Sequence, residues 1–335
     1  MPAAAIALIG VLVLVAESRK AQGARLDPVG GLLSLLGLGG LVFGIIEGPN
    51  QGWSSVPVIT AAVVAAIALP VFVYWQLHHP DPMFDVRVLR IPEVAVGAAA
   101  LAMIYFVVYT LLYLLPQSFQ YGDGMPIAQV GLALFPLGFA FAVLSPLSPR
   151  ILRWIGLRWA IGGGYILITV CVLGIALTVN ASYWVVLGWI LLFGVGWSQL
   201  VTPATAVVMD SLPLERAGDG ASVNQVSRQV GGAIGVAVVG SIVTAVYSSH
   251  LTSVPGVSAP QLATAQRSLS EAATVSADLP PDTAATLMAE AVRGFDQAFT
   301  IGLIVTGALS ALVAFVALYA LRHDPAARVS SLLSR

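Results

Sequence analysis

Long apolar runs without charged residues are the feature that most limits what this chain can fold into. A helix needs about 20 such residues to cross the hydrocarbon core of a bilayer. Only 9% of the 335 residues are charged, against about 25% in soluble domains, which excludes a water-soluble enzyme. The sequence predicts an all-α polytopic membrane protein with nine transmembrane helices. The runs lie at residues 2–16, 28–46, 56–77, 94–116, 127–148, 159–179, 183–209, 224–247 and 298–321.

The first run is shorter than the others and begins at Met1. It has no basic leader of the kind that marks a signal peptide, and charged residues follow it at 17–20. We therefore interpret it as a truncated span.

The positions of the basic residues predict the orientation of the chain, because lysine and arginine gather in the cytoplasmic loops of membrane proteins. Of the 15 basic residues, 13 follow the first, third, fifth, seventh and ninth runs. The other two, Arg267 and Arg293, lie in the one long loop of the opposite face. This pattern predicts that loop 48–55 lies outside the cell, that loop 149–158 lies in the cytoplasm, and that the C-terminus is cytoplasmic.

The long loop, residues 248–297, differs in composition from the rest of the chain. It is rich in alanine, serine, threonine and proline and holds several acidic residues. We expect a solvated extracytoplasmic connector, with one short surface helix that starts at Asp282 because aspartate is a good N-cap and good helix formers follow it.

Charged residues are absent from the middle of every run, and Arg228 is the one that enters a run, near its cytoplasmic end. Ser222 and Gln225 have the spacing of a capping box, so we expect the helix to begin there, with Asn224 and Arg228 on one face. A charge inside a span is costly and is therefore a functional candidate. We interpret Asn224, Arg228 and Gln229 as candidates for a gate; alternatively, the arginine extends to the lipid headgroups.

Small residues recur in the same run. Gly231, Gly232 and Gly235 include a pair at GxxxG spacing, which permits close approach of two helices. We therefore predict a helix-packing role for these three glycines.

Five segments resemble, in the right order, one family of membrane proteins. The most distinctive is Asn224-Gln-Val-Ser-Arg-Gln-Val-Gly-Gly-Ala-Ile-Gly235. The chain resembles the fourteen-span drug:proton antiporters (the EmrB/QacA-like group) of the major facilitator superfamily, from the end of their sixth span onward. The other four segments are Val15–Arg19, Arg25–Gly30, Gly44–Trp53 and Met83–Arg90.

The resemblance implies a domain organisation. Residues 1–27 correspond to a truncated span and a cytoplasmic loop, residues 28–92 to two linking spans, and residues 93–335 to the C-terminal six-helix bundle, with loop 248–297 inside it. The superfamily is built from two six-helix halves. Acids that couple transport to protons usually lie in the N-terminal half of this family, which is missing from the chain.

Two groups of side chains are candidates for the wall of a substrate cavity. Tyr105, Tyr109 and Tyr113 recur every four residues on a helix that, by the resemblance, borders the cavity, and aromatic faces with hydroxyl groups suit flat lipophilic compounds. The second group lies just before Pro203, where a helix break would expose carbonyl groups. It consists of Trp197, Gln199 and Thr202.

The resemblance and these residues together predict a proton-coupled multidrug efflux transporter of the plasma membrane, with small lipophilic substrates, membrane lipids and a missing N-terminal half as its partners. Two alternatives stay open: an inactive fragment that needs that half, and a non-transport membrane scaffold. The sequence contains no phosphate-binding loop, nucleophile elbow or metal-binding motif, so we expect no enzyme activity, no cofactor and no metal. The net charge of −1 argues against a nucleic-acid partner.

Overall fold

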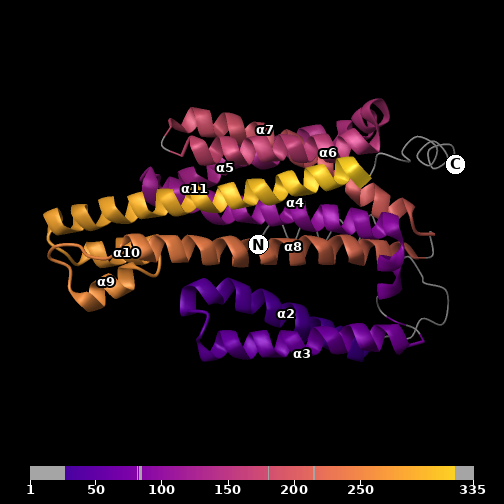
Figure 1. Ribbon diagram of the computed structural model, residues 1–335, viewed down its shortest axis with the longest axis horizontal. Coiled ribbons are helices and arrows are strands. Elements are labelled where there is room, and N and C mark those ends of the chain that lie inside the picture. Colours follow the sequence, from indigo (N-terminus) through magenta and orange to yellow (C-terminus); the bar gives the residue numbers. More distant parts are fainter. Residues whose placement is uncertain (1–26, 81, 83–84, 180, 214–215, 321–335) are drawn as a thin grey trace, which may run out of the picture.

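The computed structural model describes residues 27–80, 82, 85–179, 181–213 and 216–320, and eight long helices account for most of them (Figure 1). They are α2 (Pro28–Gln51), α3 (Val56–His78), α4 (Pro92–Gln117), α5 (Ile127–Leu144), α6 (Ser148–Leu177), α7 (Tyr183–Asp210), α8 (Ala217–His250) and α11 (Pro281–Ala320). Shorter elements connect them: η1 (Val86–Arg90), η2 (Ser118–Gly122), η3 (Ser145–Leu147), α9 (Ala259–Ala265) and α10 (Leu269–Ala277).

Each predicted run from the second to the ninth coincides with one of the long helices, whereas the first, 2–16, lies outside the described residues. Six continuous helical stretches of the described chain are long and apolar enough to cross a membrane, and one of them, 127–177, contains both α5 and α6. A shorter apolar stretch, Pro28–Gly44, lies in α2.

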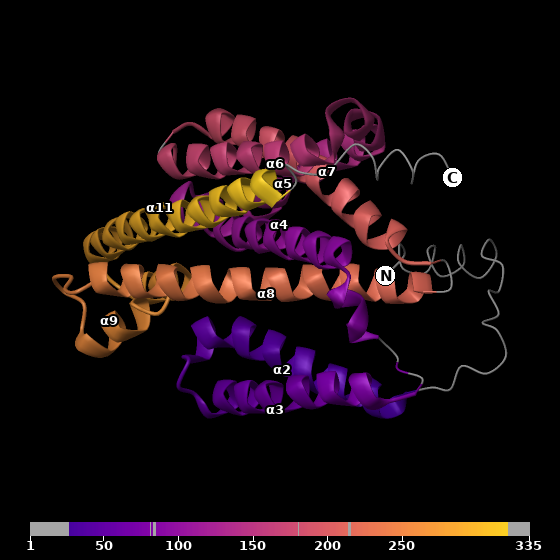
Figure 2. The ribbon, with the colours of Figure 1, turned by 45° about the vertical axis from the view of Figure 1, so that its right-hand side comes forward.

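The helices run side by side in three groups (Figures 1 and 2). Helices α4, α8 and α11 form the middle, α5, α6 and α7 lie on one side of them, and the α2–α3 pair lies on the other side, next to α8. Glycines let some of these helices approach closely. A methyl group on Gly194 of α7 would lie 2.6 Å from Cβ of Ala140 on α5, and one on Gly40 of α2 would lie 2.8 Å from the carbonyl oxygen of Ala61 on α3.

We call the end of the bundle where α7 leads into α8 the inner end, and the opposite end the outer end, after the predicted orientation. At the inner end an arginine joins two distant segments. The Arg216 guanidinium lies 2.7 Å from the Asp85 carboxylate and 2.9 Å from that of Asp219. Its hydrogen bond to Asp219 raises the pKa of Arg216. Because Asp85 precedes η1 and η1 leads into α4, this network connects the beginnings of α4 and α8.

The structure corrects two predicted boundaries at this end. The expected loop 149–158 is helical, because α6 begins at Ser148 and bends only at Gly156, whose φ is 74°. Helix α8 begins at Ala217 rather than at Ser222, whose hydroxyl donates a hydrogen bond to the Gly218 carbonyl 2.9 Å away inside the helix. Arg228 therefore lies about three turns into α8.

The outer segment 248–297 is also more ordered than a solvated connector. Helices α9 and α10 fold against the outer parts of α8 and α11 (Figure 1), and the helix expected to start at Asp282 is the beginning of the 40-residue α11. The apolar residues of α10 and the first turns of α11 recur about every three or four positions, so they share one face of each helix and bury it. We call residues 251–297 the outer cap. Its buried residues include Leu269, Ala272, Leu287, Ala291 and Phe295.

Candidate functional site

The close crossing of α4 and α8 sets the geometry of the site. Gly231 and Gly235 lie against the backbone carbonyl groups of Ala102 and Phe106, and a side chain at either glycine would collide with those carbonyls. Both pairs are four residues apart, so successive turns of the two helices meet. The contact holds the tyrosine-bearing face of α4 beside the arginine-bearing part of α8.

An aromatic cluster with one arginine occupies the inner half of this region. The guanidinium carbon of Arg228 lies 5.2 Å from the ring centre of Tyr105, within the range of a cation–π interaction. The Tyr105 ring meets the Trp197 ring edge to face, with ring centres 6.3 Å apart. The ring centre of Trp197 lies 4.4 Å from that of Phe141. Tyr105, Phe141, Trp197 and Arg228, which we call the inner cluster, come from four helices: α4, α5, α7 and α8.

Several buried polar atoms in and beside the inner cluster have no hydrogen-bond partner in the described part of the chain. They are Nε1 of Trp197, Nε of Arg228 and Oδ1 of Asn224, whose side chain lies one helical turn before Arg228. The one hydrogen bond found there for Arg228 is a long one, 3.4 Å from Nη2 to Oγ1 of Thr205, and no ion pair with an acid is found for it among the described residues. Leaving such groups unpaired is costly, so the inner cluster has spare capacity for a ligand or a partner group.

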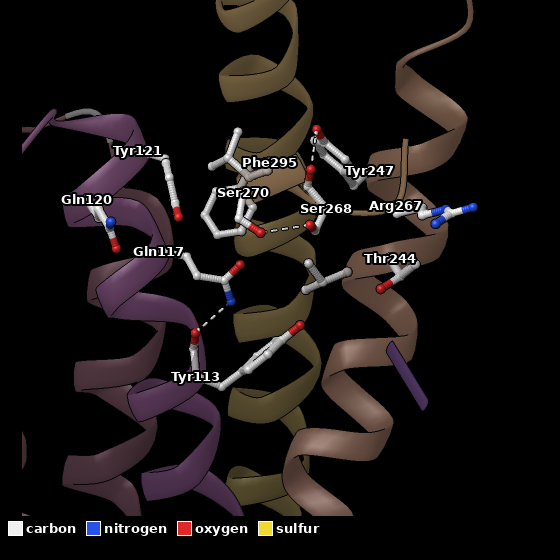
Figure 3. Close-up of a pocket in the computed structure, with 12 residues that line it drawn as sticks. Tyr113, Gln117, Gln120, Tyr121, Thr244, Tyr247, Arg267, Ser268, Ser270 and Phe295 are labelled. Atoms are coloured by element: carbon white, nitrogen blue, oxygen red, sulfur yellow. Dashed lines mark hydrogen bonds between the residues drawn. The ribbon is translucent and has the colours of Figure 1, made fainter. Parts of the chain in front are cut away.

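A cavity of about 280 Å³ lies further out, between α4, α8, α11 and the outer cap (Figure 3). Tyr113 and Gln117 form its α4 wall, and the Gln117 amide donates a hydrogen bond to the Tyr113 carbonyl. On the opposite side the Tyr247 hydroxyl, itself in the wall, donates to the carbonyl oxygens of Ala265 and Ser268 at 3.0 and 3.3 Å, which ties the outer cap to α8. The tyrosine stripe therefore leads from the inner cluster, through the exposed Tyr109, to this cavity.

The structure brings together only part of the predicted set. Trp197 meets Tyr105, but Gln199 faces a groove between α6 and α7, and the Thr202 hydroxyl shares a hydrogen bond with Ser145 at 3.1 Å. Residues two and five apart on a helix differ in direction by about 160° and 140°, so these three cannot form one wall. Gln229 is exposed. Helix α7 also continues through Pro203 without the expected break.

Sequence reasoning missed several residues of the site. Phe141 sits in an apolar run with no polar neighbour to mark it, whereas two cavity residues did have a signal. Gln117 continues the four-residue spacing of the tyrosines, and Tyr247 continues the spacing of Gly231 and Gly235 along α8. Both faces extend further than the predicted residues.

Comparison with known proteins identifies the family. The sequence profile of the Major Facilitator Superfamily matches residues 3–236, more than half of the chain. The chain belongs to the major facilitator superfamily. It is therefore a multi-pass membrane protein of a transporter family, which confirms the prediction that it is not an enzyme.

Relatives within the superfamily include several proteins named for drug resistance or export. Multidrug resistance protein Stp of Mycobacterium tuberculosis (strain ATCC 25618 / H37Rv) is 33% identical over 251 residues, which cover 75% of this chain and 47% of Stp. Lincomycin resistance protein LmrB of Bacillus subtilis (strain 168) is 28% identical, with coverage of 76% and 54%. Multidrug export protein EmrB of Escherichia coli (strain K12) is 25% identical, with coverage of 73% and 49%.

These relatives confirm the resemblance to drug efflux proteins of this superfamily, and the chain spans about half of their length. Among solved structures, a bacterial homologue of the human lysosomal transporter Spinster, in its inward-facing and occupied conformation, superposes with a TM-score of 0.55 at 17% identity. The superposition covers 86% of this chain and 64% of that one, and it shows that the fold is of the same kind.

Proposed function

We propose that the chain is the C-terminal part of a proton-coupled multidrug exporter of the plasma membrane, which moves small lipophilic compounds outward by alternating access. In this proposal nine spans cross the membrane, 28–92 supplies two linking spans, 93–335 supplies the six-helix half, and the C-terminus is cytoplasmic. Rocking of two halves around a site at their interface is the general mechanism of such transporters. The names and coverage of the relatives support the proposal.

The main observation in support of this proposed function is the inner cluster. Aromatic rings from three helices lie beside an arginine, with a buried indole N–H, a guanidinium N–H and an amide oxygen unpartnered in the described structure. Apolar walls with a few convergent polar groups are typical of small-molecule sites. Because α4, α5, α7 and α8 all contribute, a shift of any of these helices would change the site, as alternating access requires.

The arginine also favours one substrate chemistry at this point. Arg228 already occupies the face of Tyr105, so that ring is not free for a cationic compound, and the positive charge repels one. Unpaired N–H groups on Arg228 and Trp197 instead suit carbonyl, ether or acidic oxygens. We infer that the inner cluster receives lipophilic compounds that carry hydrogen-bond acceptors.

Replacement of Arg228 tests this function. We expect Arg228→Ala, in the chain produced together with an N-terminal half, to reduce drug efflux about tenfold, because the cation–π contact and the donors of a partly buried guanidinium are lost. Arg228→Lys should restore part of the activity, since it keeps the charge but not the planar donor set. Efflux of a fluorescent substrate is measured at matched amounts of membrane-inserted protein.

Gln229→Ala is the matched control, because Gln229 is the exposed neighbour on the same helix and should tolerate the change. Normal efflux by Arg228→Ala at normal expression would leave Arg228 only the role of extending toward the lipid headgroups.

The orientation is tested by cysteine labelling. We expect an impermeant thiol reagent added to intact cells to label Ser54→Cys, in the predicted outer loop, but not Gly218→Cys at the opposite end of the bundle. Both positions are exposed and Gly218 has open space for a side chain, whereas Ser148, next to the predicted inner loop 149–158, is fully buried. Native Cys171 is buried and should give little background. Labelling of Gly218→Cys but not of Ser54→Cys would reverse the orientation.

A further inference from the structure

Helices α6 and α7 lie on the side of the bundle opposite α2 and α3 (Figures 1 and 2), and residues of both line a groove that includes no residue of the inner cluster. Its volume is about 640 Å³. Gly163 and Gly164 line it where other helices would carry side chains, and a methyl group on Gly163 would meet no atom within 4 Å. Trp154 and Trp159 stand at its inner end, and Gln199 of α7 supplies its one polar amide. The groove is therefore open, apolar along its length and bordered by indoles at one end.

The indoles mark the depth of this end. Helix α6 bends at Gly156, so residues 148–155 form a separate short segment before the membrane-spanning part. Trp154 in this segment is 94% exposed, which is costly for an indole in water and favourable at the boundary between headgroups and acyl chains. The mouth of the groove thus lies at the membrane interface.

Positive charge gathers at the same end without acids to balance it. Arg150, Arg153 and Arg158 lie within nine residues of one another, and the sequence contains no aspartate or glutamate between residues 124 and 209. In the described structure none of the three forms an ion pair. The buried Nε of Arg158 lacks a hydrogen-bond partner there, and its guanidinium lies 5.6 Å from the ring centre of Trp159. These arginines are available to an anion at the level of the headgroups.

A second groove differs from the first in its lining residues. It lies between α5 and α7, has a volume of about 440 Å³, and is lined by apolar side chains together with Gly188, whose missing side chain also leaves open space. No tryptophan lines this second groove, whereas Trp154 and Trp159 line the first, and Arg153 and Arg158 directly precede these two tryptophans in the sequence. Lipid tails therefore have access to both grooves, but only the first is lined by tryptophans that each directly follow an arginine, and the Arg158 guanidinium lies over the ring of one of them, Trp159.

We propose that the α6–α7 groove binds an anionic phospholipid of the bilayer, with one acyl chain along Gly163 and Gly164 and the phosphate at Arg153 and Arg158. The indoles of Trp154 and Trp159 flank the glycerol region. An anionic headgroup is selected because it balances the unpaired arginines, whereas the ammonium group of a zwitterionic headgroup would lie among them.

Native mass spectrometry and thermal unfolding of the purified chain in detergent test the proposal. Phosphatidylglycerol is expected to stay bound and to raise the unfolding temperature, whereas phosphatidylcholine with the same acyl chains, or inorganic phosphate, has little effect. The double substitution Arg153→Gln/Arg158→Gln should weaken phosphatidylglycerol binding about 30-fold. The control Arg267→Gln removes an exposed arginine of the outer cap and should leave binding unchanged.

The apolar part is tested separately. Gly163→Leu fills the α6–α7 groove and should reduce lipid retention, whereas Gly188→Leu fills the other groove and should not. The unfolding temperature of each variant without lipid is compared with that of the native chain. If Gly163→Leu fails to fold, the double substitution Arg153→Gln/Arg158→Gln still tests the proposal. Equal binding of the two lipids, a response to phosphate alone, or equal losses from the two leucine substitutions would overturn the proposal.

Discussion

Leucine in place of Gly231 or Gly235 is expected to separate α4 from α8 and so to remove most of the folded protein. A side chain at either position would overlap a backbone carbonyl of α4, at Ala102 or Phe106, and backbone atoms, unlike the end of a flexible side chain, have no other rotamer to adopt. Overpacking of a well-filled interior costs about 1–3 kcal/mol and sometimes more. We expect each substitution to reach or exceed the upper end of that range.

The measurement is the free energy of unfolding of the chain in detergent, together with the yield of monodisperse protein. Gly188→Leu on α7 is the matched control, because the same change there meets open space and should have a small effect. If Gly231→Leu and Gly188→Leu lost the same amount of stability, the α4–α8 crossing would not depend on the absence of a side chain.

The same substitutions also concern the inner cluster, which is assembled across this crossing. Tyr105 lies on α4 one turn after Ala102, and Arg228 lies on α8 one turn before Gly231. A displacement of one helix would therefore break the 5.2 Å contact between the guanidinium and the ring. Even the methyl group of Gly231→Ala would overlap the Ala102 carbonyl, so this smaller substitution should also displace the two helices and lose transport activity together with stability.

How far sequence reasoning reached depends on the physical signal behind each inference. The eight long helices were predictable because the need to satisfy backbone hydrogen bonds in lipid forces long apolar runs into helices. The outer cap was not, because Leu269, Leu287 and Phe295 are spread through a segment whose average composition is polar. The length and composition of a segment indicate whether it can cross the membrane, but they say little about how residues pack outside the membrane.

Sequence periodicity is limited in the same way for the candidate site, where it does not tell which residues meet. The four-residue spacings of the tyrosines and of Gly231 and Gly235 each indicate one face of α4 or α8, because helical periodicity is a local property. Which faces meet depends on the whole bundle. Trp197, Gln199 and Thr202 are close in sequence and yet face three different neighbours, which a helical projection of α7 shows in part but the linear sequence hides.

The most stringent test of the proposed function uses the isolated chain. The site of a two-half transporter forms at the interface between repeats, and this chain spans about half of the length of its drug-export relatives. The central parts of its predicted spans contain no aspartate, glutamate or histidine that could take up a proton within the membrane. A substrate contact without a proton-coupling group does not convert a gradient into export.

We therefore expect the 335 residues on their own to insert stably but to show no gradient-driven efflux, and coexpression with a matching N-terminal half to restore it. Efflux of a fluorescent substrate from vesicles with and without a proton gradient is the measurement, and the Arg228→Ala variant of the coexpressed pair separates transport through the inner cluster from leakage. Gradient-dependent efflux by the purified chain alone would contradict this expectation. Two copies of the chain would then have to build both halves of the pathway, with the unpartnered donors of the two inner clusters facing one substrate.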